Sequence, residues 1–130
     1  MTSVVTYDNI KVLMAETRKT RPVSWIKGAL RDFERFPEAA KGTLLGALTI
    51  AAEGGKADIA KPLHGLGSGV LEIVLAYRGD AFRVVYAIQL AYEIWVIHAF
   101  QKKSNQGIKT PKHELDLVRD RLKRLKEAIR

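Results

Sequence analysis

Hydrophobic and polar positions follow two different periods along this chain, and the change of period separates helical from extended segments. Residues 23–26, a mostly apolar segment that includes a bulky tryptophan, predict a short strand. Apolar residues then recur three or four positions apart, which predicts two antiparallel helices joined at Pro37. The second helix is expected to turn one stripe toward the core, made of Leu44, Leu45, Leu48, Ala51 and Ala52.

Three segments farther along are rich in β-branched and aromatic residues, as strands require: residues 70–77, 81–88 and 92–100. A turn centred on Gly79 and Asp80, and a short link after the second segment, predict two hairpins. A last helix follows, with Thr110 as its N-cap and Pro111 in its first turn. The predicted fold class is α+β, an antiparallel sheet with two N-terminal helices and one C-terminal helix packed on it.

The first hairpin has two chemically different faces, because successive side chains of a strand point to opposite sides. One face is predicted to lie in the core and carries Leu71, Ile73, Leu75, Tyr77, Phe82, Val84, Tyr86 and Ile88. The other is expected to be exposed, with Arg83 opposite Ala76 and Arg78 opposite Ala81. The two arginines would then be diagonal neighbours about 7–8 Å apart, a spacing suited to a phosphate between them. Alternatively both arginines only face solvent or pair with a helix.

The net charge of the chain indicates the kind of partner, whereas its length indicates only the number of domains. At 130 residues the chain fits one domain, and its 22 Lys and Arg against 14 Asp and Glu give a net charge of +8. Such an excess favours a polyanionic partner, although a basic protein without one is the simple alternative. No cysteine is present, which excludes disulfides and thiol nucleophiles. No signal peptide or membrane span is recognisable, so we expect a soluble cytoplasmic protein with no membrane partner.

Two loops contain candidate phosphate ligands. Lys102, Lys103 and Lys109 surround a flexible polar stretch, and Phe100 just before it could stack on a base. Lys61 lies in a second loop among glycines, which allow close approach of the backbone to a ligand. An ordinary solvated connector is the alternative in both cases. The three histidines are too far apart in sequence for a recognisable metal-binding motif, so neither a metal ion nor another cofactor is expected.

Several motifs in these segments resemble one family closely. The sequence reads KPL at 61–63, LEI at 71–73, RVVY at 83–86, HAFQKKS at 98–104 and KTP at 109–111. In this order, the motifs resemble the HigB-type, phage-related branch of the RelE/ParE toxin superfamily. The similarity runs from about residue 22 to residue 130. We therefore divide the chain into an N-terminal extension, 1–21, and a toxin domain, 22–130.

The resemblance implies a RelE-like fold and a toxin of a type II toxin–antitoxin system that cleaves messenger RNA on the ribosome. It also implies a helix-turn-helix, HigA-like antitoxin as partner, in a toxin–antitoxin hetero-oligomer. Arg83, Lys102 and Lys103 match residues that stabilise the scissile phosphate in this superfamily, and Lys61 matches the lysine of KPL. Tyr86 matches a strand tyrosine, but strand alternation places it in the core.

The expected mechanism needs no metal. The ribose 2′-OH attacks its neighbouring phosphate, while Arg83 with Lys102 or Lys103 neutralises the growing charge. His98 is the candidate general acid or base, and Lys61, Arg78, Phe100 and Lys109 are the candidate substrate-binding residues. Two alternatives remain: a ParE-like poison of DNA gyrase without nuclease activity, and a basic nucleic-acid-binding module.

Overall fold

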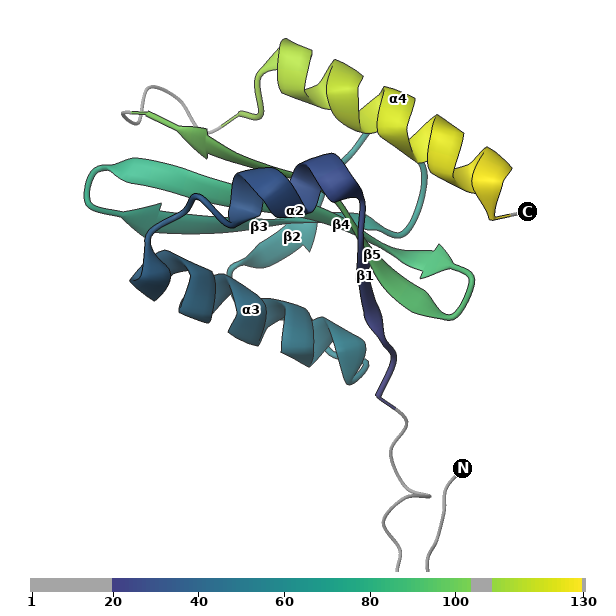
Figure 1. Cartoon of the computed structure of the whole chain (residues 1–130), viewed down its shortest axis with the longest axis horizontal. Helices are drawn as coiled ribbons and strands as arrows, with labels where there is room; N and C mark the ends of the chain where they lie inside the picture. Colours follow the sequence, from purple (N-terminus) through teal and green to yellow (C-terminus); the bar gives the residue numbers. More distant parts are fainter. Residues whose placement is uncertain (1–19, 104–108, 130) are drawn as a thin grey trace, which may run out of the picture.

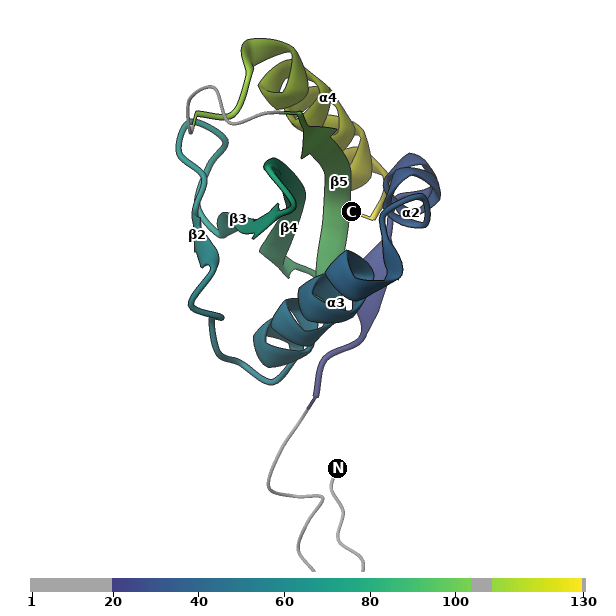
Figure 2. The same ribbon diagram turned by 90° about the vertical axis from the view of Figure 1, so that its left-hand side faces the viewer.

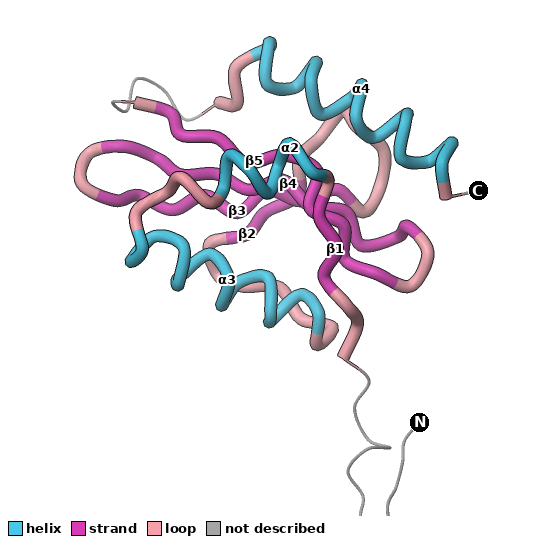
Figure 3. The backbone as a smooth tube through the Cα atoms, viewed as in Figure 1, coloured by secondary structure: helices cyan, strands magenta, loops and turns pink. Residues whose placement is uncertain are grey.

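The computed structural model describes residues 20–103 and 109–129, which form three helices and five strands (Figures 1 and 3). In chain order the elements are β1 (Val23–Trp25), α2 (Lys27–Phe33), α3 (Glu38–Ala52), β2 (Ala60–Pro62), β3 (Val70–Tyr77), β4 (Asp80–Leu90), β5 (Glu93–Lys102) and α4 (Lys112–Ala128). Most of the predicted extension, residues 1–19, lies outside the described part. The predicted α+β class is confirmed.

The five strands form one sheet in the order β1-β5-β4-β3-β2. Three of the four strand pairs are antiparallel, but β1 runs parallel to β5, with Val23 opposite Ile94. The expectation of a purely antiparallel sheet is therefore wrong. α2 and α3 carry the chain away after β1, so β1 can join the sheet edge in the direction of β5. β2 was not predicted, because its sequence, Ala-Lys-Pro, is not rich in β-branched or aromatic residues.

The turn of the first hairpin is centred one residue earlier than predicted, which shifts every cross-strand partner by two residues. Tyr77 pairs with Asp80, so the turn consists of Arg78 and Gly79, whose φ angles are 52° and 87°. Two positive φ angles match the right-handed twist of a hairpin, and glycine supplies one of them without strain. A shift of two residues leaves each side chain on its predicted face but changes its partner, so Arg83 lies opposite Val74 and not Ala76.

Helices lie on both sides of the sheet (Figure 2), and a hydrophobic core lies on each of its faces. α2 and α3 cover the larger core, which contains all of the predicted inward positions of the hairpin: Leu71, Ile73, Leu75, Tyr77, Phe82, Val84, Tyr86 and Ile88. α4 lies on the other side of the sheet. It closes a smaller core with Val118, Leu122 and Leu125 against Val85 and Ile97. Glu72, Arg83, Val85 and Ala87 on this other face of the first hairpin are thus buried, where exposure was predicted, whereas Ala76 and Arg78 near the turn are exposed.

Two further local expectations are wrong. Leu45 is 45% exposed, because the inward stripe of α3 follows Leu44 and Leu48, and Leu45 lies about 100° around the helix from Leu44. Pro111 is the N-cap of α4, and no side chain caps this end. The hydroxyl of Thr110 instead bonds to a carboxylate of the sheet. In the described part of the chain, no helix is long and apolar enough to cross a membrane.

A candidate nucleic-acid interface

The sheet face under α4 brings four strands into cross-strand rows. In one row Lys61 of β2 lies opposite Glu72, Glu72 opposite Val85, and Val85 opposite His98. The next row joins Val74, Arg83 and Phe100, and the third joins Ala76, Ala81 and Lys102. Cross-strand neighbours on one face have Cβ atoms about 5 Å apart. The face therefore collects five of the predicted residues, Lys61, Arg83, His98, Phe100 and Lys102, together with Glu72.

Arg83 is held in a buried cluster with Glu72 and Thr110. Its Nη1 lies 3.4 Å from both carboxylate oxygens of Glu72 and 3.2 Å from the hydroxyl of Thr110. The Thr110 hydroxyl donates to Glu72 Oε2 at 2.7 Å. Arg83 is only 2% exposed and Glu72 1%, so the expected exposed arginine is wrong. A carboxylate two residues along the neighbouring strand and the segment before α4 cover it.

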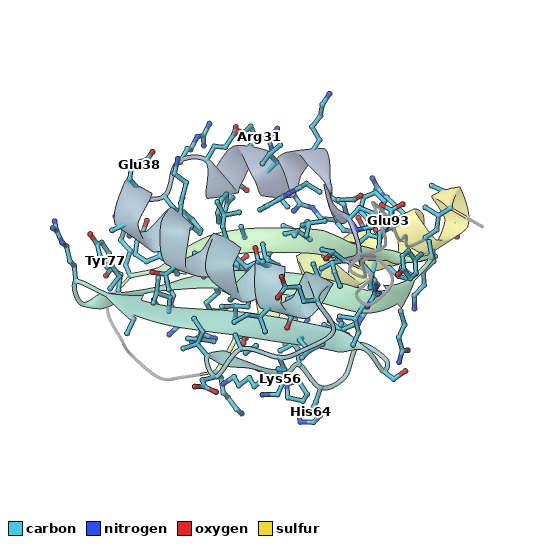
Figure 4. The ribbon with its side chains drawn as sticks, turned by 90° about the horizontal axis from the view of Figure 1, so that it is seen from below. Arg31, Glu38, Lys56, His64, Tyr77 and Glu93 are labelled. Carbon is cyan, nitrogen blue, oxygen red and sulfur yellow. The ribbon has the colours of Figure 1, made fainter. Side chains whose placement is uncertain are left out.

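An open groove of about 760 Å³ lies directly above this cluster. Its walls come from β2 with the following loop and from the start of α4, and its lining residues are Lys61, Pro62, Leu63, His64, Glu72, Lys109, Thr110, Pro111, Lys112 and Leu115. Three lysines and a histidine thus surround one carboxylate, whose charge Arg83 offsets from beneath. His64 lies at the molecular surface in Figure 4. The groove has the charge and openness that an extended polyanion requires.

His98 lies in a separate polar cluster on the other side of Arg83. Its Nε2 is 2.6 Å from Glu114 Oε1, and Arg121 Nη1 donates to its Nδ1 at 3.2 Å and to the Ile97 carbonyl at 3.0 Å. Arginine can only donate hydrogen bonds, so Nδ1 must accept and Nε2 carries the proton given to Glu114. The imidazole is therefore neutral, with one defined tautomer.

The surroundings of His98 favour this neutral form. Burial lowers the pKa of His98, and the positive charge of Arg121 lowers it further, while Glu114 acts in the opposite direction. The ring of His98 stacks on Phe100, with centroids 5.1 Å apart. Both side chains line a second groove of about 410 Å³ between α2 and α4. His98 therefore does not line the groove of Lys61 and Lys109, and both of its nitrogens are engaged.

The remaining predicted residues are distributed around this face. Lys102 is half-buried at the end of β5, and Lys103 is exposed beside it. Lys109 lines the first groove, and its role as a substrate ligand stays a prediction. Arg78 lies in the hairpin turn and packs its guanidinium over Tyr77, 5.2 Å from the ring centroid. The prediction that Arg78 and Arg83 are diagonal neighbours across the hairpin is therefore wrong. The loop residues 104–108 lie outside the described part.

The side chains that pair with the predicted residues, or line the groove beside them, were not predicted. Glu72 could have been found, because it is the one charged residue in the apolar segment 70–77 and shares strand parity with Arg83. Lys112, Glu114 and Arg121 gave no comparable signal among the many charges of the last helix. Tyr86 was expected in the core and is 1% exposed, and its burial raises the pKa of the phenol.

Comparisons with known proteins agree with the fold and with the toxin-family resemblance. The E. coli toxin RelE, solved in the free state as a mutant with two arginines replaced by alanine, is 17% identical with a TM-score of 0.56. The match covers 81% of this chain and 97% of that one, so the two share the RelE-like fold. A search of curated proteins finds no match. The model of the phage-derived Gp49-like proteins (DUF891) matches residues 31–123, so this chain belongs to that family.

Proposed function

We propose that this chain is the toxin of a type II toxin–antitoxin system, of the HigB kind, and cleaves messenger RNA on the ribosome. The observation that carries the proposal is the groove above Arg83, where Lys61, Lys109 and Lys112 converge on a RelE-like scaffold. The net charge of +8 and membership of the Gp49-like family support the same conclusion. The working partner would be a helix-turn-helix antitoxin of the HigA kind, and the site of action the cytoplasm.

The lysines of the groove supply the binding step. Lys61 projects from β2, while Lys109 and Lys112 flank the start of α4, so a single strand lying in the groove meets cations from both walls. Phosphate contacts position a nucleic acid without reading its sequence. Lys102 and Lys103 at the end of β5 would extend the phosphate contacts along the RNA. The ribosome would then hold the messenger in line for reaction.

The chemical step proceeds through the ribose next to the scissile phosphate. The 2′-oxygen forms a bond to phosphorus, and the bond from phosphorus to the 5′-oxygen breaks. The 5′-oxygen takes up a proton from water in the open groove, so the products are a 2′,3′-cyclic phosphate and a 5′-hydroxyl. Glu72, the carboxylate that faces the groove, is our candidate to accept the 2′-OH proton. Arg83 is the candidate to stabilise the phosphorane, which requires the phosphate to replace part of its contact with Glu72.

His98 has a more restricted role in this proposal. The prediction that it carries a proton requires Glu114 or Arg121 to release one of its ring nitrogens. With both contacts in place, His98 joins β5 to α4 and so fixes Lys112 and Thr110 at the groove.

Cleavage assays with and without ribosomes test the proposal. The purified chain is added to a translating extract and, separately, to the same messenger as naked RNA. We expect rapid cleavage in the extract and little on naked RNA. Equal cutting of naked RNA would contradict ribosome dependence. Intact messenger in both, with arrested DNA synthesis on induction in cells, would instead favour gyrase poisoning.

A further inference from the structure

The outer side of α3 lacks charge over three helical turns. No charged residue occurs from Gly42 to Ala52, in a chain of which 28% of the residues are charged. Leu45 and Ile50 are 45% and 42% exposed and lie on the two edges of this side, about 140° apart around the helix. Exposed residues between them are glycine and threonine. An uncharged, exposed side with a large apolar side chain at each edge is the kind of surface that another apolar segment can cover.

The polar groups on this side need no water. Thr43 donates its hydroxyl hydrogen bond to the Ala39 carbonyl at 3.3 Å, and Thr49 donates to the Leu45 carbonyl at 2.9 Å. Covering the surface with apolar side chains would therefore leave neither hydroxyl without a hydrogen bond. The outer side of α3 can be buried without the usual penalty for polar groups.

Gly42 and Gly46 lie one turn apart on the same side, and the packing of the described residues does not explain them. A Cβ atom added at either position would meet nothing within 4 Å. Glycine within a helix lowers its stability relative to alanine, so open space around both positions leaves that loss without an internal reason. Close approach of another segment to the helix backbone would supply the reason.

The N-terminal segment is attached at the right place to be that other segment. Arg21 donates its backbone N–H to the carbonyl of Ala52 at 2.9 Å, so the chain enters the domain beside the C-terminal end of α3 (Figure 1). α3 has 15 residues and is about 22 Å long at 1.5 Å per residue. Sixteen residues, 4–19, amount to about 24 Å at the helical rise of 1.5 Å per residue and to more when extended, so the segment is long enough to follow α3. Because they are tethered there, their effective concentration at α3 is high.

The sequence of this segment matches the surface. Tyr7, Ile10, Leu13 and Met14 are spaced three, three and one apart, with Asp8, Asn9 and Lys11 between them. On a helical period these four positions fall on one side. The segment precedes the family match, which begins at residue 31. We propose that residues 4–15 bind the outer side of α3 within the same molecule, covering Leu45 and Ile50 and passing over Gly42 and Gly46.

Paramagnetic NMR on the full chain tests this contact without depending on the proposed function. Because the chain has no cysteine, a nitroxide can be attached through Ala39→Cys, at the end of α3 far from residue 20. We expect strong broadening of the amide signals of residues 4–9. The same label at Lys123→Cys, on α4, should leave those signals sharp.

A charge variant separates binding from tethering. Leu45→Lys with Ile50→Lys changes two exposed side chains, so the fold should persist, and the broadening from Ala39→Cys should fall severalfold. Unchanged broadening in this variant would overturn the proposal. Broadening that appears when ¹⁵N-labelled chain without nitroxide is mixed with unlabelled spin-labelled chain would assign the surface to a second copy and also overturn it.

Discussion

The two faces of the sheet are built from the same strands but follow different chemistry. Toward α2 and α3, every inward position of the first hairpin is apolar, and Ile73, Val84 and Tyr86 are at most 1% exposed. Toward α4, the same strands bury Glu72, Arg83 and His98. Burying charged groups costs free energy unless each finds a partner, and all three have partners here. The face toward α2 and α3 stabilises the domain. The face toward α4 buries a group of charged and polar side chains that stability alone would not require.

Removing the arginine is expected to have the largest effect. Arg83→Met leaves the Glu72 carboxylate buried without its ion pair, which should lower the free energy of unfolding by about 3–5 kcal/mol. This reverses the expectation from an exposed arginine, whose loss would barely change folding. Urea denaturation measures the change. The double variant with Glu72→Leu should recover most of it, and a failure to recover would mean that the pair does not set the stability of this face.

A matched pair of valines compares the two faces directly. Val84 is fully buried under α3, whereas Val74, beside Arg83 on the α4 face, is half-buried. Val84→Ala removes two buried methyl groups and leaves a cavity, so we expect a loss of about 2–3 kcal/mol. Val74→Ala should cost clearly less. Equal losses in denaturant titrations would show that the α4 face packs as tightly as the larger core.

Lowering the pH is expected to reduce the free energy of unfolding through His98, on the sheet face toward α4. Burial lowers the pKa of His98 in the folded protein below its unfolded value of about 6.5. Between these two values the unfolded chain binds more protons, so the free energy of unfolding falls as pH drops through about 6.5. We expect His98→Gln to flatten this part of the pH profile. The exposed His113→Gln is the control, and a profile that keeps its slope in His98→Gln would contradict the argument.

The smallest effect concerns single lysines of the groove. Lys61→Ala should weaken RNA binding and reduce the slope of log affinity against log salt concentration by ~0.7, the contribution of one contact to a single strand. Filter binding at several salt concentrations measures the slope. Lys27→Ala, on α2, is the control. If both variants have the wild-type slope, the RNA does not contact Lys61.

The periods of hydrophobic residues in strands and helices predicted most of the fold, and the motifs indicated the family. Parity alone placed Tyr86 and Val84 in the core and put Arg83 on the opposite face. The cover over Arg83 could not be predicted, because it depends on how α4 lies across strands that are distant in sequence. The same holds for Thr110, which looks like a helix cap locally but bonds to Glu72 from across the sheet. β1 pairs with β5 about seventy residues away, and no local pattern indicates its direction.

Cleavage by a triple groove variant tests the central claim most directly. Lys61→Ala, Lys109→Ala and Lys112→Ala together remove three cations from the groove, and Lys27→Ala, Arg31→Ala and Lys123→Ala remove the same charge elsewhere. Both sets lie on exposed positions, so both variants should fold. In a translating extract we predict that the groove variant loses messenger cleavage at least tenfold, while the charge-matched control stays near wild type. Equal activity of the two variants would contradict the assignment of this groove as the RNA site.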